Sequence, residues 1–401
     1  MHRISLMFII LLTAQVATAQ QYTVTDLGTL GGIGSTARDI NESGQVTGWS
    51  TNGSQEHAFL YSDGYMRDLG TLPGGNHSAG YGISGGKAHG KGNIFQQRHV
   101  YVTGDANLET CHTTLCGPNH AFLWKDGYMQ DLGLLPGGSD SHGLAVNRAG
   151  QVTGEAAVST PEGGRSHAFL YSNGQMRDLG LLPGGSYSEG FDINDGEIGD
   201  DNKKDGEHSD SEENVQITGF AETASGWGHA FIYSNGTMRD LGTLPGGRAS
   251  AGYAINQFGE VTGTSDDSAG SSRAFLYDKD GMHDLGTLPG TDWSIGSGIN
   301  RYGHVVGHTY KYPYEFRAFI YRDTIMQDLN DLIPLDSGWR IDQAQGINDR
   351  GEIIGTGERN GVSRQILLTP ICNRDSHRGK ECDEQNGNKH IEFPNNGFRK
   401  P

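Results

Sequence analysis

One hairpin sequence recurs through the chain, and this repetition is the strongest constraint on the fold. HAFLYSDGYMRDLG at 57–70 is a β-prone run, an Asp-Gly turn and a second short run that ends in glycine. Five variants of it follow at 120–133, 167–180, 229–242, 273–286 and 317–330. Six copies of one such unit indicate a repeat architecture, in which each unit packs against its neighbours.

Two further motifs between the hairpins give each unit four strand candidates. A run of small residues ends in Ile-Asn, as in TARDIN at 36–41, and a turn then leads into GxVTG, as in GQVTG at 44–48. The aspartate of each DLG or DLN marks the period and recurs at Asp26, Asp68, Asp131, Asp178, Asp240, Asp284 and Asp328. The spacing is about 44 residues, with two longer steps of about 62, which matches propeller blades rather than the shorter coils of a solenoid.

The two ends of the array carry complementary half-hairpins. YTVTDLG at 22–28 is a second half without its first, and RQILLTP at 364–370 is a first half without its second. Joining them completes a seventh hairpin and leaves no open sheet edge. The sequence therefore predicts an all-β, seven-bladed β-propeller of about 44-residue four-stranded repeats, closed by an N-terminal strand that completes the last blade. From the axis outwards, we expect the Ile-Asn, VTG, HAF and DLG strands.

In the expected innermost strand, each unit carries one small residue and one aliphatic residue at fixed positions. Strict alternation would place the small residues towards the crowded channel and the aliphatic residues on the opposite face, between blades. The small residues are Ala37, Gly80, Gly143, Gly190, Gly252, Gly296 and Ala344. The aliphatic residues are Ile40, Ile83, Val146, Ile193, Ile255, Ile299 and Ile347.

The chain divides into three expected segments. Residues 1–19 have a basic start, an apolar run and a small-x-small end, the layout of a secretory signal peptide. Residues 20–371 form the propeller, with insertions near 84–100, 105–119 and 195–214, and residues 372–401 form a polar tail. No later stretch has the roughly 20 apolar residues of a transmembrane helix. We therefore expect a secreted protein, extracellular or periplasmic, without a transmembrane segment after signal cleavage.

Four cysteines form two local pairs in the sequence, Cys111 with Cys116 and Cys372 with Cys382. In an exported protein, two small disulfide loops are the simplest interpretation, the second of them in the C-terminal tail. Four cysteines allow three pairings, and the spacing does not choose among them.

The charge balance excludes nucleic acid as the expected partner. The formal net charge is −18, and no basic run interrupts the acidic background. Nucleic-acid binding requires lysines and arginines that neutralise phosphates.

The sequence also lacks a nucleophile elbow, an HExxH zinc motif, a phosphate-binding loop and a dinucleotide fingerprint. No cofactor or metal is therefore predicted. The acidic stretch at 195–214 offers oxygen ligands for calcium, but it lacks the DxDxDG spacing and is better interpreted as a solvated loop.

Taken together, HAFLY, the Asp-Gly or Asn-Gly turn, MxDLG, the small-residue Ile-Asn and GxVTG resemble the HAF family of extracellular repeat proteins. The resemblance covers residues 22 to 368. It implies a secreted bacterial repeat protein, often tied to the cell surface, with no reaction assigned. The polar tail departs from the apolar C-terminal sorting signal that some relatives carry, and arginine replaces the HAF histidine at Arg273, Arg317 and Arg364.

The repeated polar residues are interpreted as structural. The HAF histidines lie in the third strand of successive units, away from the axis, so a contact with the repeated aspartate is favoured over a ring of metal ligands. These histidines are His57, His120, His167 and His229. Catalytic groups are seldom needed seven times, whereas hydrogen bonds at turns and strand ends are.

We instead expect the functional site on the face of the ring where aromatic residues occur outside the repeated motifs. Exposed aromatic rings beside polar groups are suited to binding sugars by stacking and hydrogen bonds. The candidate ligand-binding residues are Trp227, Trp293, Tyr310, Tyr312, Tyr314 and Trp339. The alternative is that each tryptophan caps its own blade. The sequence thus favours a secreted, non-catalytic propeller that binds an extracellular polysaccharide or protein.

Two other classes of function remain open. A polysaccharide lyase or glycosidase on the propeller scaffold would require His308, Tyr310, Tyr312 and Arg317 to converge in a cleft with a carboxylate such as Asp292 or Glu315. A purely structural surface protein would show no such cluster. The sequence assigns no oligomeric state.

Overall fold

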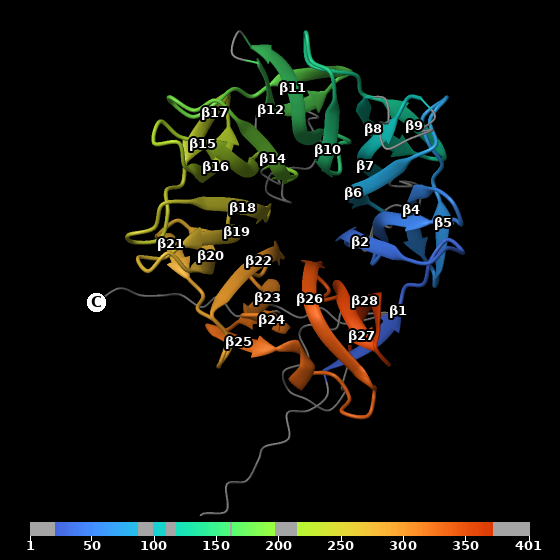
Figure 1. Ribbon diagram of the computed structural model, residues 1–401, viewed down its shortest axis with the longest axis vertical. Coiled ribbons are helices and arrows are strands. Elements are labelled where there is room, and N and C mark those ends of the chain that lie inside the picture. The colour runs from blue at the N-terminus through green and yellow to red at the C-terminus, as the bar shows by residue number, and fades with distance from the viewer. Residues whose placement is uncertain are drawn as a thin grey trace, which may run out of the picture.

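The structure is a computed structural model that describes residues 21–86, 99–109, 118–160, 163–196, 215–313 and 315–371. The predicted signal peptide, the four cysteines, Tyr314, the C-terminal tail and most of each insertion lie outside the described residues. Seven four-stranded antiparallel sheets stand around one axis (Figure 1). The predicted seven-bladed β-propeller is confirmed.

The blades are numbered in chain order. Blade 1 contains β2 (Ser35–Ile40), β3 (Val46–Thr51), β4 (Glu56–Ser62) and β5 (Tyr65–Asp68). Blade 2 contains β6 (Ser78–Gly85), β7 (Val100–Asn107), β8 (Asn119–Lys125) and β9 (Tyr128–Asp131). Blade 3 contains β10 (Ser141–Val146), β11 (Val152–Thr160), β12 (Gly163–Ser172) and β13 (Gln175–Asp178). Blade 4 contains β14 (Ser188–Ile193), β15 (Ile217–Glu222), β16 (Gly228–Ser234) and β17 (Thr237–Asp240).

Blade 5 contains β18 (Ser250–Ile255), β19 (Val261–Asp266), β20 (Ser272–Asp278) and β21 (Gly281–Asp284). Blade 6 contains β22 (Trp293–Ile299), β23 (Val305–Lys311), β24 (Glu315–Arg322) and β25 (Ile325–Asp328). Blade 7 contains β26 (Trp339–Ile347), β27 (Ile353–Arg359), β28 (Val362–Pro370) and, from the other end of the chain, β1 (Tyr22–Asp26). A short 3₁₀ helix, η2 (Leu329–Asp331), connects blades 6 and 7. None of the described residues belongs to a helix with the length and hydrophobicity needed to cross a lipid bilayer.

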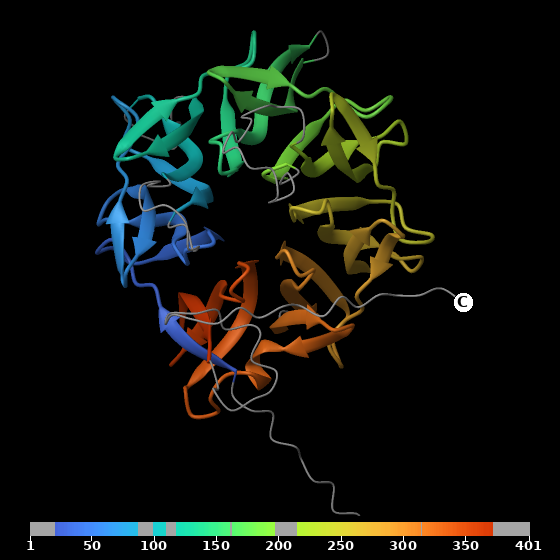
Figure 2. The same cartoon turned by 180° about the vertical axis from the view of Figure 1, so that it is seen from behind.

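Closure of the ring follows the predicted strand order. β1 pairs antiparallel with β28, from Tyr22 opposite Pro370 to Asp26 opposite Ile366. Viewed from behind, β1 lies on the outer edge of the last blade (Figure 2). The first strand of each blade is innermost and the DLG strand is at the rim (Figure 1). The turns that join strands 1–2 of each blade, and strands 3–4 of blades 1 to 6, therefore share one face, called the turn face. The strand 2–3 turns and the connections between blades share the opposite face, called the connection face.

The repeated motif residues form the packing between blades. The HAF phenylalanines are fully buried, and the last blade has Ile366 at this position. The phenylalanines are Phe59, Phe122, Phe169, Phe231, Phe275 and Phe319. Hairpin turns such as Asn173-Gly174 have positive φ at both residues, 51° and 79°, as a two-residue turn between twisted strands requires. These residues explain why the HAF hairpin recurs.

A β-bulge corrects the expected alternation along the innermost strands. In blade 1 the register shifts between Ala37 and Asp39, and the equivalent shift occurs in every other blade. The bulge adds one residue, so Ala37 and Ile40 lie on the same face, in one cluster with Ile354 of blade 7. The small residues therefore face the preceding blade and not the channel. The aliphatic residues pack between blades, as predicted.

Close approach between blades explains the glycine among these small residues. A Cβ on Gly190 would lie 2.4 Å from the Thr153 hydroxyl of the preceding blade, and four other blades repeat this arrangement. In the remaining two, Val306 and Ile354 replace the threonine, and alanine replaces the glycine at Ala344 and Ala37. At each boundary between blades, glycine on one side thus occurs with threonine on the other, and alanine occurs with valine or isoleucine.

A belt of asparagines around the axis explains the Ile-Asn motif. Oδ1 of Asn147 accepts hydrogen bonds from the backbone N–H groups of Ala149 and Gln151, which closes the turn after the first strand. Its Nδ2 donates to the backbone carbonyl of Asn194 in the next blade, at 3.2 Å. The same bridge joins blades 4 to 5, 5 to 6, 6 to 7 and 7 to 1. In blade 2, Ser84 occupies this position, next to the first insertion.

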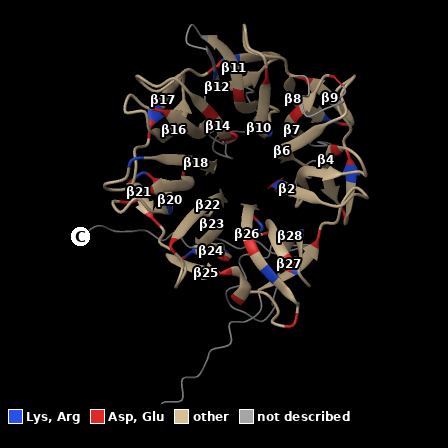
Figure 3. Ribbon diagram, viewed as in Figure 1, with Lys and Arg blue, Asp and Glu red and all other residues tan. Residues whose placement is uncertain are grey.

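Charged residues are distributed over the whole ring. Figure 3 shows lysines and arginines scattered over several blades rather than gathered on one.

Candidate functional site

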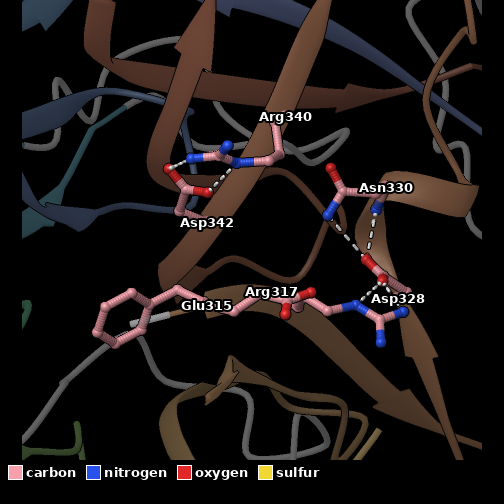
Figure 4. A pocket seen from close by; sticks show the side chains of 7 residues that line it. Glu315, Arg317, Asp328, Asn330, Arg340 and Asp342 are labelled. Carbon is pink, nitrogen blue, oxygen red and sulfur yellow. Dashed lines mark hydrogen bonds and ion pairs between the residues drawn. The ribbon is translucent and has the colours of Figure 1, made fainter. Parts of the chain in front are cut away.

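A cavity opens on the connection face between blades 6 and 7. It encloses about 570 Å³ and is lined by the start of β24, the end of β25 with η2, and the start of β26. The lining residues are Glu315, Phe316, Arg317, Asp328, Asn330, Arg340 and Asp342 (Figure 4). We call it the blade 6–7 pocket. Its walls are mostly charged, with one aromatic side chain.

One wall of the blade 6–7 pocket is built around a buried aspartate. Asp328 accepts a hydrogen bond of 2.7 Å from Nε of Arg317 and one of 2.9 Å from Nδ2 of Asn330. The second guanidinium arm of Arg317 donates to the carbonyl of Pro289 at 3.1 Å. Both carboxylate oxygens of Asp328 are therefore engaged, and Arg317 is held in a fixed orientation.

The opposite wall carries a second arginine. Nε of Arg340 donates to Asp342 at 2.8 Å, and a terminal nitrogen donates to Glu358 at 2.8 Å. The hydrogen bond to Asp342 raises the pKa of Arg340 above its ordinary value, and Glu358 adds to this shift. Arg340 nevertheless remains exposed, as does Glu315 across the pocket. A hydroxyl-rich ligand would meet hydrogen-bond donors and acceptors on both sides of the pocket.

An aromatic group lies beside the pocket in blade 6. Phe316 is 5.7 Å from Tyr310, and Tyr310 stacks on Trp293 with ring centroids 4.8 Å apart. Tyr312 follows in the turn after β23 and is 76% exposed. Three of the predicted aromatic residues thus lie on the same blade, next to the pocket that contains Arg317 and Glu315.

The other two described aromatic candidates, Trp339 and Trp227, do not line the pocket. Trp339 begins β26, next to Arg340, and Arg359 lies over its ring at 5.6 Å. Trp227 lies in the β15–β16 turn of blade 4, is 47% exposed and has Arg248 over its ring at 5.9 Å. Trp227 is therefore separated from the other candidates by blade 5.

His308 does not line the blade 6–7 pocket, and neither do Tyr310 and Tyr312. Burial lowers the pKa of His308 to about 4, and Nδ1 has no hydrogen-bond partner. The carbonyl of Asp292 accepts a hydrogen bond from Arg273. Of the four residues that the lyase or glycosidase hypothesis required to converge, only Arg317 lines this pocket.

The repeated histidines contact the repeated aspartates, as predicted. Nδ1 of His167 lies 2.8 Å from Asp178, and Oδ1 of Asp178 accepts the backbone N–H of Gly180 at 2.7 Å. The same pair occurs in blades 1, 2 and 4, and Arg317 with Asp328 replaces it in blade 6. Among the described residues, no group of three or more His, Cys, Asp or Glu side chains could hold a metal ion.

A second group of residues, of which the sequence interpretation singled out only His308, lies around the innermost strands. The residue after VTG pairs across the sheet with the residue before the small position of the first strand. These pairs form what we call the inner ring: Thr36–Trp49, Ala79–Asp105, His142–Glu155, Glu189–Phe220, Ala251–Thr264, Ile295–His308 and Gln343–Thr356. The signal was present in the sequence, because the residue after VTG differs in nearly every repeat while its neighbours recur.

In blades 2 to 4 the inner ring carries a sector of titratable side chains. Asp105 is buried, and one of its oxygens lies 3.6 Å from Nδ1 of His142, whose pKa it raises. The hydroxyl of Tyr187 lies 3.0 Å from Oε2 of Glu155 and 2.8 Å from Oε2 of Glu189. Burial raises the pKa of Glu189 to about 7, and the neighbouring charge of Glu155 adds to the shift.

Comparison with known proteins gives no assignment. No protein-family model and no curated protein matches the chain. Among solved structures, it is similar to the β-propeller domain of the Trilobed protease from Pyrococcus furiosus, with 12% identity over 76% of this chain and 83% of that chain and a TM-score of 0.45.

Two further solved structures match at lower scores. A puromycin-hydrolyzing peptidase of Mycobacterium tuberculosis shares 11% identity over 82% of this chain and 50% of its own, with a TM-score of 0.41. Trypanosoma rangeli sialidase shares 8% identity over 87% and 55%, with a TM-score of 0.38. The chain thus spans about half the length of these two enzymes. None of these similarities assigns an activity to this chain.

Proposed function

We propose that this protein is a secreted, non-catalytic HAF-repeat propeller that binds an extracellular polysaccharide through the connection face. The observation that carries the proposal is the blade 6–7 pocket beside the aromatic group of Trp293, Tyr310 and Phe316. Aromatic faces stack on sugar rings, and charged donors and acceptors bind their hydroxyls. Secretion and membership of the HAF family rest on the sequence motifs alone.

The hydrogen bonding in the pocket favours binding over catalysis. Asp328 is engaged by Arg317 and Asn330, and Asp342 is engaged by Arg340. A general base needs an oxygen available to take a proton, and a general acid needs a raised pKa. Both aspartates instead accept hydrogen bonds from arginines. The lyase or glycosidase alternative would need Glu315 as its acid or base.

The test is a glycan-array screen on the mature protein, run beside an assay for release of reducing or unsaturated sugar ends. We expect binding without release. Phe316→Ala should weaken binding about tenfold or more, because an aromatic contact contributes about 0.5–1.5 kcal/mol beyond its buried area. Arg340→Ala should weaken it as well. Trp227→Ala is the matched control, an exposed aromatic residue on another blade, and should bind like the wild type.

Each outcome is decisive. Release of sugar ends that Glu315→Gln abolishes would replace the proposal by the enzyme alternative. Binding that Trp227→Ala abolishes and Phe316→Ala spares would move the site away from the blade 6–7 pocket. No binding to any polysaccharide would overturn the proposal and favour a structural or protein-binding propeller.

A further inference from the structure

The inner ring contains buried polar atoms that lack hydrogen-bond partners. Among the described residues, seven buried side-chain atoms have no hydrogen-bond partner. Two of them, Oγ1 of Thr264 and Nδ1 of His308, belong to the inner-ring residues that follow the VTG or VVG motif in blades 5 and 6. In blade 2, Oδ1 of Asp105 lies 3.6 Å from Nδ1 of His142. An unsatisfied buried polar group costs about 1–3 kcal/mol, so the inner ring offers positions for a polar partner.

The contacts of the Tyr187 hydroxyl indicate that two carboxylates of the inner ring lie close together without a positive charge between them. This hydroxyl has one proton and lies within hydrogen-bond distance of both Glu155 and Glu189. It can donate to one carboxylate only. The other must bring a proton of its own, and the raised pKa of Glu189, about 7, agrees with this. The two carboxylates, Glu155 and Glu189, therefore share a proton. A bound cation in its place would neutralise their charge equally well.

The charged groups around this pair do not neutralise it. From the neighbouring strand β10, His142 faces it but also pairs with Asp105. Arg38 lies in blade 1, where it stacks on Trp49 at 4.8 Å and on Tyr81 at 5.7 Å. The sector that contains both glutamates thus retains an excess of negative charge.

Aromatic side chains complete the wall of this sector. Phe191 of blade 4 and Tyr253 of blade 5 lie 5.5 Å apart on neighbouring first strands. Tyr253 is close enough to Glu189 for that carboxylate to add to the effect of burial in raising the tyrosine pKa. Both rings and both glutamates are only partly buried, so a ligand can reach them. Carboxylates beside aromatic faces are the combination that binds an ammonium group.

We propose that the inner ring binds the protonated primary amine of an unacetylated amino sugar between Glu155 and Glu189, with Phe191 and Tyr253 as its aromatic wall. The ammonium group has three donors, enough for both carboxylates and one further acceptor of the ring. The proposal rests on the proposed polysaccharide-binding function and names the sugar class for a second site. Acetylation of the amine would remove the charge and with it the attraction.

The test is isothermal titration of the full chain with a glucosamine hexamer, an N-acetylglucosamine hexamer and spermidine. We expect the glucosamine hexamer to bind at least tenfold more tightly than either of the others. Glu155→Gln and Glu189→Gln should each weaken that binding at least tenfold. Both changes keep the side-chain shape, and a thermal melt shows whether each variant is folded. Glu56→Gln, an exposed carboxylate on blade 1, removes the same charge and should leave the affinity unchanged.

The outcomes separate this proposal from the proposed function. Equal affinity for the acetylated hexamer, or glutamine variants that bind like the wild type, would overturn it. Equally tight binding of spermidine would show that the ring recognises charge alone and would also overturn the amino-sugar assignment. If a polysaccharide binds and only Phe316→Ala or Arg340→Ala weakens it, the blade 6–7 pocket stands and the inner-ring site falls.

Discussion

The side-chain amide of Asn348 in blade 7 donates a hydrogen bond of 3.0 Å to the backbone carbonyl of Asn41 in blade 1. These residues are 307 positions apart in the chain. The bond is the last bridge of the asparagine belt and crosses the boundary between blades 7 and 1, beside the sheet that β1 completes. It therefore joins the two ends of the array near the axis, as β1 does at the rim.

Replacing Asn348 by alanine should cost more than replacing Asn41. Both asparagines close the turn after their first strand through Oδ1, but only the Asn348 amide has a bond across to the next blade. Loss of a turn cap costs about 0.5–2 kcal/mol, and loss of the bridge about 1 kcal/mol more. Urea denaturation of Asn348→Ala and Asn41→Ala measures the difference. Equal losses in the two variants would show that the bridge contributes nothing.

Gly190→Ala should destabilise the protein by about 1–3 kcal/mol, the usual cost of overpacking. The new Cβ would lie 2.4 Å from the Thr153 hydroxyl, which is itself held by a bond to the carbonyl of Phe169. Gly34→Ala is the matched control, because Gly34 has no atom within 4 Å of its Cβ position and no positive φ. The measurement is the free energy of unfolding of both variants. A Gly190→Ala protein as stable as the control would contradict the close approach between blades.

Asp178→Ala should destabilise the protein more than His167→Ala. Asp178 accepts hydrogen bonds from His167 and from the backbone N–H of Gly180, whereas loss of His167 leaves the second bond in place. We expect about 1–2 kcal/mol for the aspartate and about half of that for the histidine. Thermal melts of the two variants provide the comparison. The opposite order would mean that the histidine has a role beyond its contact with the aspartate.

Stability should fall as the pH rises from about 5 to about 8. The folded-state pKa values of Glu189 and Asp192 are raised to about 7, and that of Asp39 to about 6, chiefly because burial disfavours the ionised form. A carboxyl group with a raised folded-state pKa stabilises the fold below its unfolded pKa, and this contribution disappears as the pH passes the folded value. Asp195 faces Asp192, and Glu155, Tyr187 and His142 face Glu189.

Glu189→Gln tests this assignment. Glutamine mimics the protonated carboxyl group and does not titrate, so the melting temperature of the variant should fall less between pH 5 and pH 8 than that of the wild type. Glu56→Gln, with its exposed carboxylate, should keep the full dependence. A variant with an unchanged pH dependence would remove Glu189 from the groups responsible.

The repeat and its closure could be predicted from the sequence because both are local patterns. The DLG period and the half-hairpins at 22–28 and 364–370 led to the blade count, the strand order and the pairing of β1 with β28. The bulge next to Ala37 could not be predicted, because no residue type marks it. Strict alternation therefore assigned the small residues to the wrong face.

The functional residues were harder to predict, because the contacts that define them join different blades. Aromatic enrichment found Trp293 and Tyr310, which stack as neighbours on adjacent strands. It did not find the inner ring, where Glu155 and Glu189 meet at one tyrosine hydroxyl from two blades. Only the variation of the residue after VTG pointed to this region.

The pairing of β1 with β28 also has a consequence for the timing of assembly. Blade 7 draws its outer strand from residues 22–26 and its other three strands from residues 339–370, so β1 is synthesised well before its partner β28. All strands of blades 1 to 6 are synthesised before those of blade 7 that follow β1. The ring cannot close until about residue 370 is available to pair with Tyr22. A chain that stopped between blades 6 and 7 would leave β1 without its partner β28 and blade 6 without blade 7 beside it. Closure of the ring therefore requires synthesis of β28, and a chain that stops before β28 should be more sensitive to proteolysis than the closed ring.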